Sequence, residues 1–361
     1  HCHGGATTSK AFFNLFSSIK GLRHAEAGEF SRRALVNGKI DLIKAEAIND
    51  IIMAETEKQR ELAVRQLNEG LSIPINLWRQ DIIKILSKIE ATIDFSDEED
   101  VPEKIETKND LKSLSKNINA VLNEGERYEL ISEGAKIALT GLPNSGKSSL
   151  FNNIIKNERS IVTKIPGTTR DVIEKKINLK GYAITFYDTA GIRETKDVIE
   201  KEGIKKALNA VKEADLVLNI VDLTIKNSRN LNKTSSKTWN VFNKIDKYKS
   251  EKLEAKTNKK EAIWVSAKTG EGVKELLEKI HRHVFKKSHS NTKERYFFTN
   301  LRQKNDLKNA LHNIQFAILE KEEEIAAEHL RLSLNDLERI LGKFDVEEVL
   351  GNIFSNFCIG K

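Results

Sequence analysis

The sequence is poor in cysteine and has no long apolar run. Its 361 residues include two cysteines, Cys2 and Cys358, which are too few for a disulfide framework and fit a reducing cytosol. No stretch approaches the roughly 20 apolar residues that a membrane-spanning helix needs, and no signal peptide is recognisable. We therefore expect a cytoplasmic protein without membrane spans.

The charge balance leaves the partner open. The formal net charge is +7, and lysines gather between residues 244 and 260. Such a cluster is as consistent with a solvated surface as with an anionic partner, because a charge of this size permits RNA contact without demonstrating it.

Helical periodicity flanks a central block of short strands. Apolar residues recur at helical spacing over residues 39–68, 75–93 and 109–130, and again after residue 291, with a last helix expected near 346–354. Between about 135 and 284, short apolar strands alternate with helices, which is typical of a mostly parallel sheet. We predict an all-α helical domain from residues 33–132 and 286–361, with an α/β domain, residues 133–285, inserted into it.

The first 32 residues show little periodicity, and the chain begins at His1. We expect residues 1–32 to be the remnant of an N-terminal domain.

A phosphate-binding loop opens the α/β block. An apolar strand at residues 136–140 leads into Gly141-Leu142-Pro143-Asn144-Ser145-Gly146-Lys147-Ser148, and a helix follows from Ser149. This strand–loop–helix context gives the motif its meaning. The glycines let backbone N–H groups face the β-phosphate, while Lys147 would reach the β- and γ-phosphates and Ser148 would hold Mg²⁺.

Four further motifs follow the loop, in the order that a GTP site requires. One of Thr168 and Thr169, with Thr169 preferred, would sense the γ-phosphate, and Asp188 ends a strand before Gly191. The Asp246 carboxylate can accept two hydrogen bonds that guanine offers and adenine does not. The expected GTP contacts are Asn144, Ser145, Gly146, Lys147, Ser148, Ser149, Thr163, Thr168, Thr169, Asp188, Thr189, Ala190, Gly191, Asn243, Lys244, Asp246, Ser266, Ala267 and Lys268.

Each of these motifs alone could be an ordinary turn. Together, in order and at strand ends, they predict a P-loop GTPase domain. Ile192 stands where many GTPases carry a water-orienting glutamine, so this help must come from elsewhere. Asn144 could help to bind a monovalent cation, and Glu200 could position the water, although Glu200 also fits an exposed helix start.

At this point the chain resembles the MnmE (TrmE) family of tRNA-modifying GTPases over essentially its whole length. The resemblance rests on residues 2–5, on Gly28-Glu-Phe-Ser-Arg-Arg-Ala34 and Asn37-Gly-Lys-Ile-Asp-Leu42, and on Ala45-Glu-Ala47 and Ile93-Asp-Phe95. Its most specific part is the terminus, Phe357-Cys358-Ile359-Gly360-Lys361.

The resemblance implies K⁺-dependent GTP hydrolysis by paired GTPase domains. Carried over by motif, Asn144, Thr163, Ile165 and Thr168 would bind K⁺, Ser148 and Thr169 would bind Mg²⁺, and Glu200 matches the catalytic glutamate.

The family acts with an FAD-containing partner, MnmG, on C5 of the wobble uridine of certain tRNAs, using a tetrahydrofolate derivative. Lys39 and Lys361 match folate-contacting positions. The family's N-terminal domain, which holds most of the folate pocket and the homodimer interface, is represented here only by residues 1–32.

Several readings stay open. Cys358 fits a packed thiol in apolar surroundings as well as a site-lining role. One rival function is a regulatory or ribosome-assembly GTPase, which has no evident need for the Gly28–Leu42 and Cys358–Lys361 segments. A membrane-remodelling GTPase would need a lipid-binding helix, and none is convincing.

Overall fold

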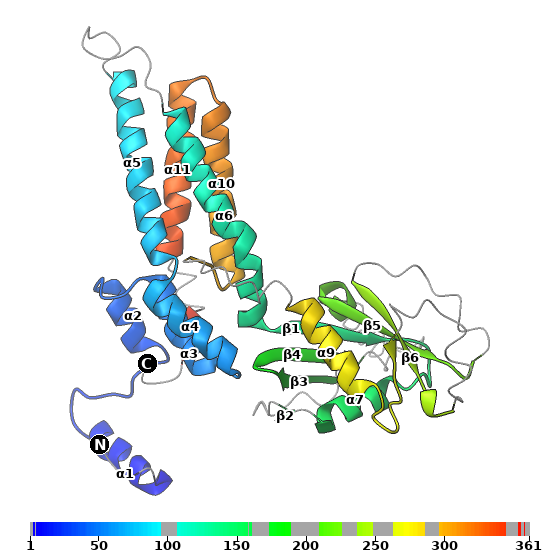
Figure 1. The fold of residues 1–361 in the computed structure, drawn as a ribbon. Helices are drawn as coiled ribbons and strands as arrows, with labels where there is room; N and C mark the ends of the chain where they lie inside the picture. Colours follow the sequence, from blue (N-terminus) through cyan, green and yellow to red (C-terminus); the bar gives the residue numbers. More distant parts are fainter. Residues whose placement is uncertain are drawn as a thin grey trace, which may run out of the picture. The chain divides into compact units, whose positions relative to one another are not determined.

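The computed structural model describes residues 3, 5–94, 107–157, 159–160, 173–188, 209–225, 237–247, 263–285, 296–343, 353–354 and 357. The chain divides into two compact units (Figure 1). The helical unit comprises His1–Ile52, Ala63–Asn123 and Arg295–Lys361, and the α/β unit comprises Met53–Leu62 and Glu124–Glu294.

Eight helices carry the described part of the chain outside the central α/β block. They are α1 (Ala6–Ser17), α2 (Glu29–Val36), α3 (Leu42–Met53), α4 (Glu57–Glu69), α5 (Ser72–Asp94), α6 (Lys108–Glu133), α10 (Leu301–Leu319) and α11 (Glu323–Leu341). Unit boundaries fall before the last residue of α3 and inside α4 and α6. α1 buries none of its residues.

One apolar core joins helices from both sides of the inserted block. Buried side chains of α5 and α6, such as Ile82 and Ile118, belong to the same cluster as Leu307, Ile314 and Leu337 of α10 and α11, and these helices run side by side in Figure 1. Their apolar residues recur every three or four positions, which places them on one face of each helix. The predicted insertion of an α/β domain into a helical domain is confirmed.

The prediction of one helix over residues 39–68 is wrong, because the chain breaks between α3 and α4. Thr56 and Gln59 form a capping box: the Gln59 amide donates to Thr56 Oγ1 (3.3 Å), and the Thr56 amide donates to Gln59 Oε1 (3.1 Å). This Thr-x-x-Gln pattern starts a new helix. The apolar spacing continues across the break and hides it.

A buried ion pair holds α3 against α10. Arg302 Nε donates to one Glu46 carboxylate oxygen and Nη2 to the other, both at 2.9 Å, and Gln303 Nε2 donates to Glu46 at 2.7 Å. The Glu46 side chain is 10 % exposed and that of Arg302 is 19 % exposed. Such a pair is costly to break, because the remaining charge stays buried without its counter-charge.

The α/β unit is built on a seven-stranded sheet among the described residues, with the order β2-β3-β4-β1-β5-β6-β7. Its strands are β1 (Ala135–Thr140), β2 (Arg159–Ser160), β3 (Ile173–Leu179), β4 (Tyr182–Asp188), β5 (Leu216–Asp222), β6 (Thr238–Asn243) and β7 (Ile263–Trp264). β2, β3 and β4 pair antiparallel, and all other pairs are parallel. The carboxyl ends of β4, β1, β5 and β6 therefore share one edge.

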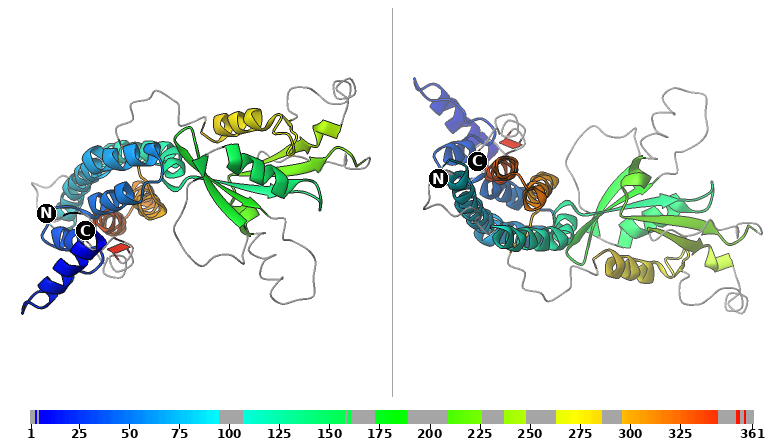
Figure 2. Two further views of the ribbon diagram at one scale, coloured as in Figure 1. Left: turned by 90° about the horizontal axis from the view of Figure 1, so that it is seen from below. Right: turned by 90° about the horizontal axis from the view of Figure 1, so that it is seen from above.

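Side chains pack on both faces of this sheet, and α7 and α9 cover one of them. α7 (Lys147–Asn157) and α9 (Val273–Val284) bury their apolar faces in one cluster with Ile137 and Leu139 of β1, and α9 lies along one side of the sheet in both views of Figure 2. Ala138, between those two residues, packs on the opposite face with Val217 and partly buried Val211. This alternation is the two-residue period of a strand buried on both faces.

We expect Glu46→Gln to destabilise the helical unit by on the order of 3 kcal/mol, because the Arg302 charge then stays partly buried without its counter-charge. Urea unfolding followed by circular dichroism at 222 nm measures the loss as a lower midpoint.

Glu90→Gln is the matched control. Glu90 pairs with Arg331, but both side chains are at least 40 % exposed, so this change should cost less than about 1 kcal/mol. Equal losses for the two variants would contradict a special role for the buried pair.

Candidate functional site: the nucleotide-binding edge of the sheet

Two glycines shape the loop between β1 and α7. A Cβ at Gly141 would lie 2.3 Å from the Ile220 carbonyl oxygen, and one at Gly146 would lie 2.2 Å from Nδ2 of Asn243. Both glycines, and Asn144 between them, have positive φ, a region that costs other residues energy. The loop thus packs its backbone tightly against β5 and β6 and leaves no room for side chains at these two positions.

The predicted phosphate-contacting residues gather at this loop and at the start of α7. Lys147 is buried, and its Nζ donates to the carbonyl oxygens of Gly141 (2.9 Å) and Leu142 (3.0 Å). Burial lowers the pKa of Lys147, and nearby Asp188 opposes that shift. A phosphate would oppose it further, since it adds negative charge. Ser148 and Ser149 are exposed at the N-terminus of α7, where an anion is stabilised.

Asn243, at the end of β6, holds the loops together. Its Nδ2 donates to the Ser145 carbonyl (2.8 Å), and its Oδ1 accepts from the backbone amides of Lys244 (2.8 Å) and Ala267 (2.9 Å). The side chain is 1 % exposed. All three hydrogen bonds go to backbone groups of the protein, so the Asn243 side chain stabilises the loop conformations.

Asp246 is the residue predicted to select guanine. It lies in the 3₁₀ turn η1 (Ile245–Lys247) and is exposed. Ser266 Oγ donates to its Oδ1 (2.7 Å) and in turn accepts from the Thr269 amide (3.1 Å). Lys268 is exposed beside them, whereas Ala267 is buried. The carboxylate is therefore oriented while it faces solvent, as a base-binding acceptor must be.

The Mg²⁺ and switch side of the site is described only in part. Asp188 ends β4, is 5 % exposed, and pairs in register with Leu139 of β1, so its carboxylate lies at the same sheet edge as the loop. The other residues expected here, Thr163, Ile165, Thr168, Thr169, Thr189, Ala190, Gly191, Ile192 and Glu200, lie outside the described residues.

Sequence reasoning missed Asp222, at the end of β5. Its Oδ2 accepts from Lys244 Nζ (2.5 Å), and its Oδ1 accepts from the amide (2.9 Å) and hydroxyl (2.7 Å) of Thr224. Burial alone would raise the pKa of Asp222, but these hydrogen bonds bring it below its ordinary value. A carboxylate at the end of a predicted apolar strand was the available signal.

Lys39, one of the two folate candidates, lies in the helical unit. It lines a cavity of about 490 Å³ together with Lys44, Asp41, Asn76 and Lys343. Lys361 and Cys358 lie outside the described residues. Phe354 and Phe357 are buried against Leu42 and Ala45 of α3, so these two residues lie at the start of that helix.

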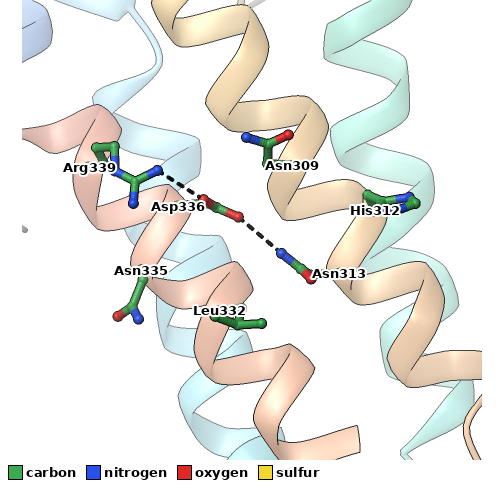
Figure 3. Close-up of a pocket in the computed structure, with 7 residues that line it drawn as sticks. All are labelled: Asn309, His312, Asn313, Leu332, Asn335, Asp336 and Arg339. Atoms are coloured by element: carbon green, nitrogen blue, oxygen red, sulfur yellow. Dashed lines mark hydrogen bonds and ion pairs between the residues drawn. The ribbon is translucent and has the colours of Figure 1, made fainter.

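A second cavity of about 320 Å³ lies between α10 and α11 (Figure 3). Asp336 accepts from Asn313 Nδ2 (3.1 Å) and pairs with Arg339 (3.3 Å). The two charged side chains that line the cavity, Asp336 and Arg339, therefore neutralise each other. In the described part of the chain, His, Cys, Asp and Glu side chains form no group of three suited to a metal ion. Every helix described there is too short or too polar to cross a bilayer.

Comparison with known proteins decides the family. The model of the MnmE helical domain matches residues 42–358. A tRNA modification GTPase MnmE of Rickettsia rickettsii (strain Sheila Smith) is 39% identical over 368 residues, which cover 100% of this chain and 82% of the relative. The chain belongs to the MnmE family.

Two further comparisons accompany this one. The MnmE of Rhodopseudomonas palustris is 40% identical over 364 residues, covering 100% of this chain and 81% of its own. Among solved structures, the G domain of the T. maritima FeoB iron transporter is 30% identical, with a TM-score of 0.31, and the match covers 41% of this chain and 98% of that one. The relatives are named GTPases, and this chain has the phosphate loop, Asp188 and Asp246 at one sheet edge. The chain is therefore a GTPase.

We expect Asp246→Asn to weaken GTP binding by about a hundredfold or more. One guanine hydrogen bond loses its charged acceptor, and the new NH₂ group faces the guanine amino group, which is also a donor. Xanthosine triphosphate should bind the variant better than GTP does, because its C2 carbonyl can accept from the new amide. Isothermal titration calorimetry with each nucleotide measures both affinities directly.

Asp81→Asn, on the exposed side of α5, is the control and should change neither affinity. An equal loss for both nucleotides in Asp246→Asn would indicate a damaged loop and argue against base selection by this carboxylate.

Proposed function

We propose that this chain couples K⁺-dependent GTP hydrolysis to modification of tRNA at C5 of the wobble uridine, with an FAD-containing MnmG-type partner. The observation that carries the proposal is the joint presence of two features: a phosphate loop with Asp246 near the same sheet edge, and the MnmE helical domain. Relatives named tRNA modification GTPases are 39% identical to this whole chain. The chain is accordingly a tRNA modification GTPase.

Hydrolysis would proceed by in-line attack of a water oxygen on the γ-phosphorus. The bond from that phosphorus to the β–γ bridging oxygen breaks, leaving GDP and inorganic phosphate. The phosphate keeps the water oxygen with one of its two protons, and the other proton is released to solvent. Lys147 and the loop amides would offset the charge that develops on these oxygens. Glu200 would hold the attacking water, a task that Ile192 cannot perform.

The donors present suit the metal ions that the family implies. Ser148 at the helix start and Asp188 at the strand end supply oxygen ligands or acceptors for hydrated Mg²⁺, with Thr169 as the proposed second direct ligand. Asn144 stands exposed on the loop with φ 60° and would bind K⁺ with Thr163, Ile165 and Thr168. K⁺ there would supply the positive charge that an arginine finger provides in other GTPases.

The helical unit suits an anionic cosubstrate. Lys39, Lys44 and Lys343 line one cavity, and their ammonium groups would attract the carboxylates of a tetrahydrofolate derivative. Lys361 would join them, and Cys358 would line the same site. The burial of Phe354 and Phe357 against α3 supports this part of the proposal. Homodimerisation would follow the pattern of the full-length family.

We expect cells that lack the gene to lose the aminomethyl-type modification at the wobble uridine, because no hydrolysis cycle then drives the modifying complex. Mass spectrometry of nucleosides from purified tRNA measures the loss. Wild-type complementation should restore the modification, and Glu200→Ala, which should bind GTP without turning it over, should not.

The control variant is Asp81→Asn, which should restore modification fully. Unchanged modification in the deletion strain, accompanied by accumulation of ribosomal precursors, would contradict the proposal and favour an assembly GTPase.

We expect GTP hydrolysis to be on the order of a hundredfold faster in KCl than in NaCl at equal ionic strength, the scale of a lost electrostatic contact to a transition state. Asn144→Ala should remove most of this difference while it keeps GDP binding. Phosphate release under single-turnover conditions measures the rates.

Asn178→Ala serves as the matched control, because Asn178 Oδ1 accepts from Gly181 in the β3–β4 hairpin of the same unit. It should preserve the K⁺ response. Equal wild-type rates in the two salts would exclude the cation mechanism.

A further inference from the structure

Asp222 occupies the position in the sheet where the two halves of the nucleotide site meet. The phosphate loop follows β1, the guanine-recognition loop follows β6, and β5 lies between them. Because these strands are parallel, the end of β5 must lie between the two loops. Asp222 is that end residue, and it is 5 % exposed.

The two carboxylate oxygens of Asp222 have separate partners. Oδ1 accepts both hydrogen bonds from Thr224 and thereby shapes the turn after β5. Oδ2 accepts from Lys244 Nζ at 2.5 Å. The same ammonium donates to the carbonyl oxygen of Asn144 at 2.9 Å, so one chain of contacts runs from β5 through the guanine loop to the phosphate loop.

Both ends of the Lys244–Asn144 contact have an unfavourable backbone conformation. Lys244 has φ 69° and Asn144 has φ 60°, a left-handed region that persists only where the surroundings enforce it. The ammonium is a flexible point charge with three donors, so it needs a counter-charge to stay on one carbonyl. The buried carboxylate of Asp222 supplies that counter-charge.

We propose that Asp222 is a positioning residue that holds the Lys244 ammonium on the Asn144 carbonyl and so couples guanine recognition to the geometry of the phosphate loop. Where it concerns K⁺, the inference rests on the proposed function, because Asn144 is the proposed K⁺ ligand. The contact between the two loops does not depend on K⁺.

The coupling has two measurable consequences. Loss of the Asp222 charge should weaken nucleotide binding even without K⁺, since Lys244 no longer fixes both loops. It should also raise the K⁺ concentration for half-maximal hydrolysis, because the Asn144 side chain then has to be ordered by the ion itself.

A double-mutant cycle on the full chain tests the link. Asp222→Asn keeps an acceptor for Thr224 but turns an NH₂ group toward the Lys244 ammonium. We expect it to weaken binding of a fluorescent GDP analogue in K⁺-free buffer by about tenfold, the equivalent of one charge-assisted hydrogen bond. In a Lys244→Met background the same change should have no further effect, because a residue that acts through Lys244 has nothing left to act on.

Two controls separate positioning from a structural role. Thr224→Val removes the donor hydroxyl on the other carboxylate oxygen, and Asp215→Asn alters the carboxylate just before β5, which accepts from the Lys136 amide (2.8 Å). Both should leave GDP affinity and the half-maximal K⁺ concentration unchanged. If thermal melts show that Asp222→Asn is poorly folded, Asp222→Ser replaces it in the same cycle, with the same expected loss.

The outcomes are distinct. Additive effects of Asp222→Asn and Lys244→Met, or no loss of GDP affinity in Asp222→Asn, would overturn the inference. Equal hydrolysis by the wild type in KCl and NaCl would refute the K⁺ part of the proposed function, while the binding cycle in K⁺-free buffer would still decide the role of Asp222.

Discussion

The parallel pairing of β4, β1, β5 and β6 is the constraint on which the nucleotide site depends. It forces the carboxyl ends of four strands to one edge of the sheet, as is general for open α/β sheets. Asp188, Asp222 and Asn243 are the last residues of β4, β5 and β6, and the phosphate loop follows β1. The phosphate loop and the loop after β6, which are about a hundred residues apart in the sequence, are therefore neighbours because of the strand pairing alone.

Asn243 converts this proximity into a fixed geometry. Its three hydrogen bonds reach the phosphate loop, the guanine loop and the segment after β7. The contact requires glycine at position 146, where a Cβ would lie 2.2 Å from the amide nitrogen. Gly146 of the phosphate motif thus leaves room for the Asn243 side chain, which ties the phosphate loop to the loop that carries Asp246.

Local motifs predicted the α/β unit well, because strand ends and turns are specified by neighbouring residues. The role of Asp222 was not predicted. It depends on the order of the strands in the sheet, and no short stretch of sequence specifies that order. Likewise, the scaffolding task of Asn243 depends on where Ser145 and Ala267 come to lie. In the helical unit, apolar spacing alone predicted one helix over residues 39–68. The Thr56-x-x-Gln59 capping box is recognisable in the sequence, and it starts a new helix despite the continuing apolar spacing.

The helical core joins α5 and α6 to α10 and α11, which lie on opposite sides of the α/β block in the sequence. Bringing these helices together costs conformational entropy. Closing a flexible loop costs only about 0.6 kcal/mol per doubling of its length, and here the insert is itself folded. Its first strand residue, Ala135, and its last described residue, Phe285, belong to one apolar cluster. Both ends of the insert are therefore anchored in the core of the α/β unit. The insert is a folded domain and not a flexible loop. The tie between Glu46 and Arg302 can then form across 256 positions of sequence without ordering a long chain between them.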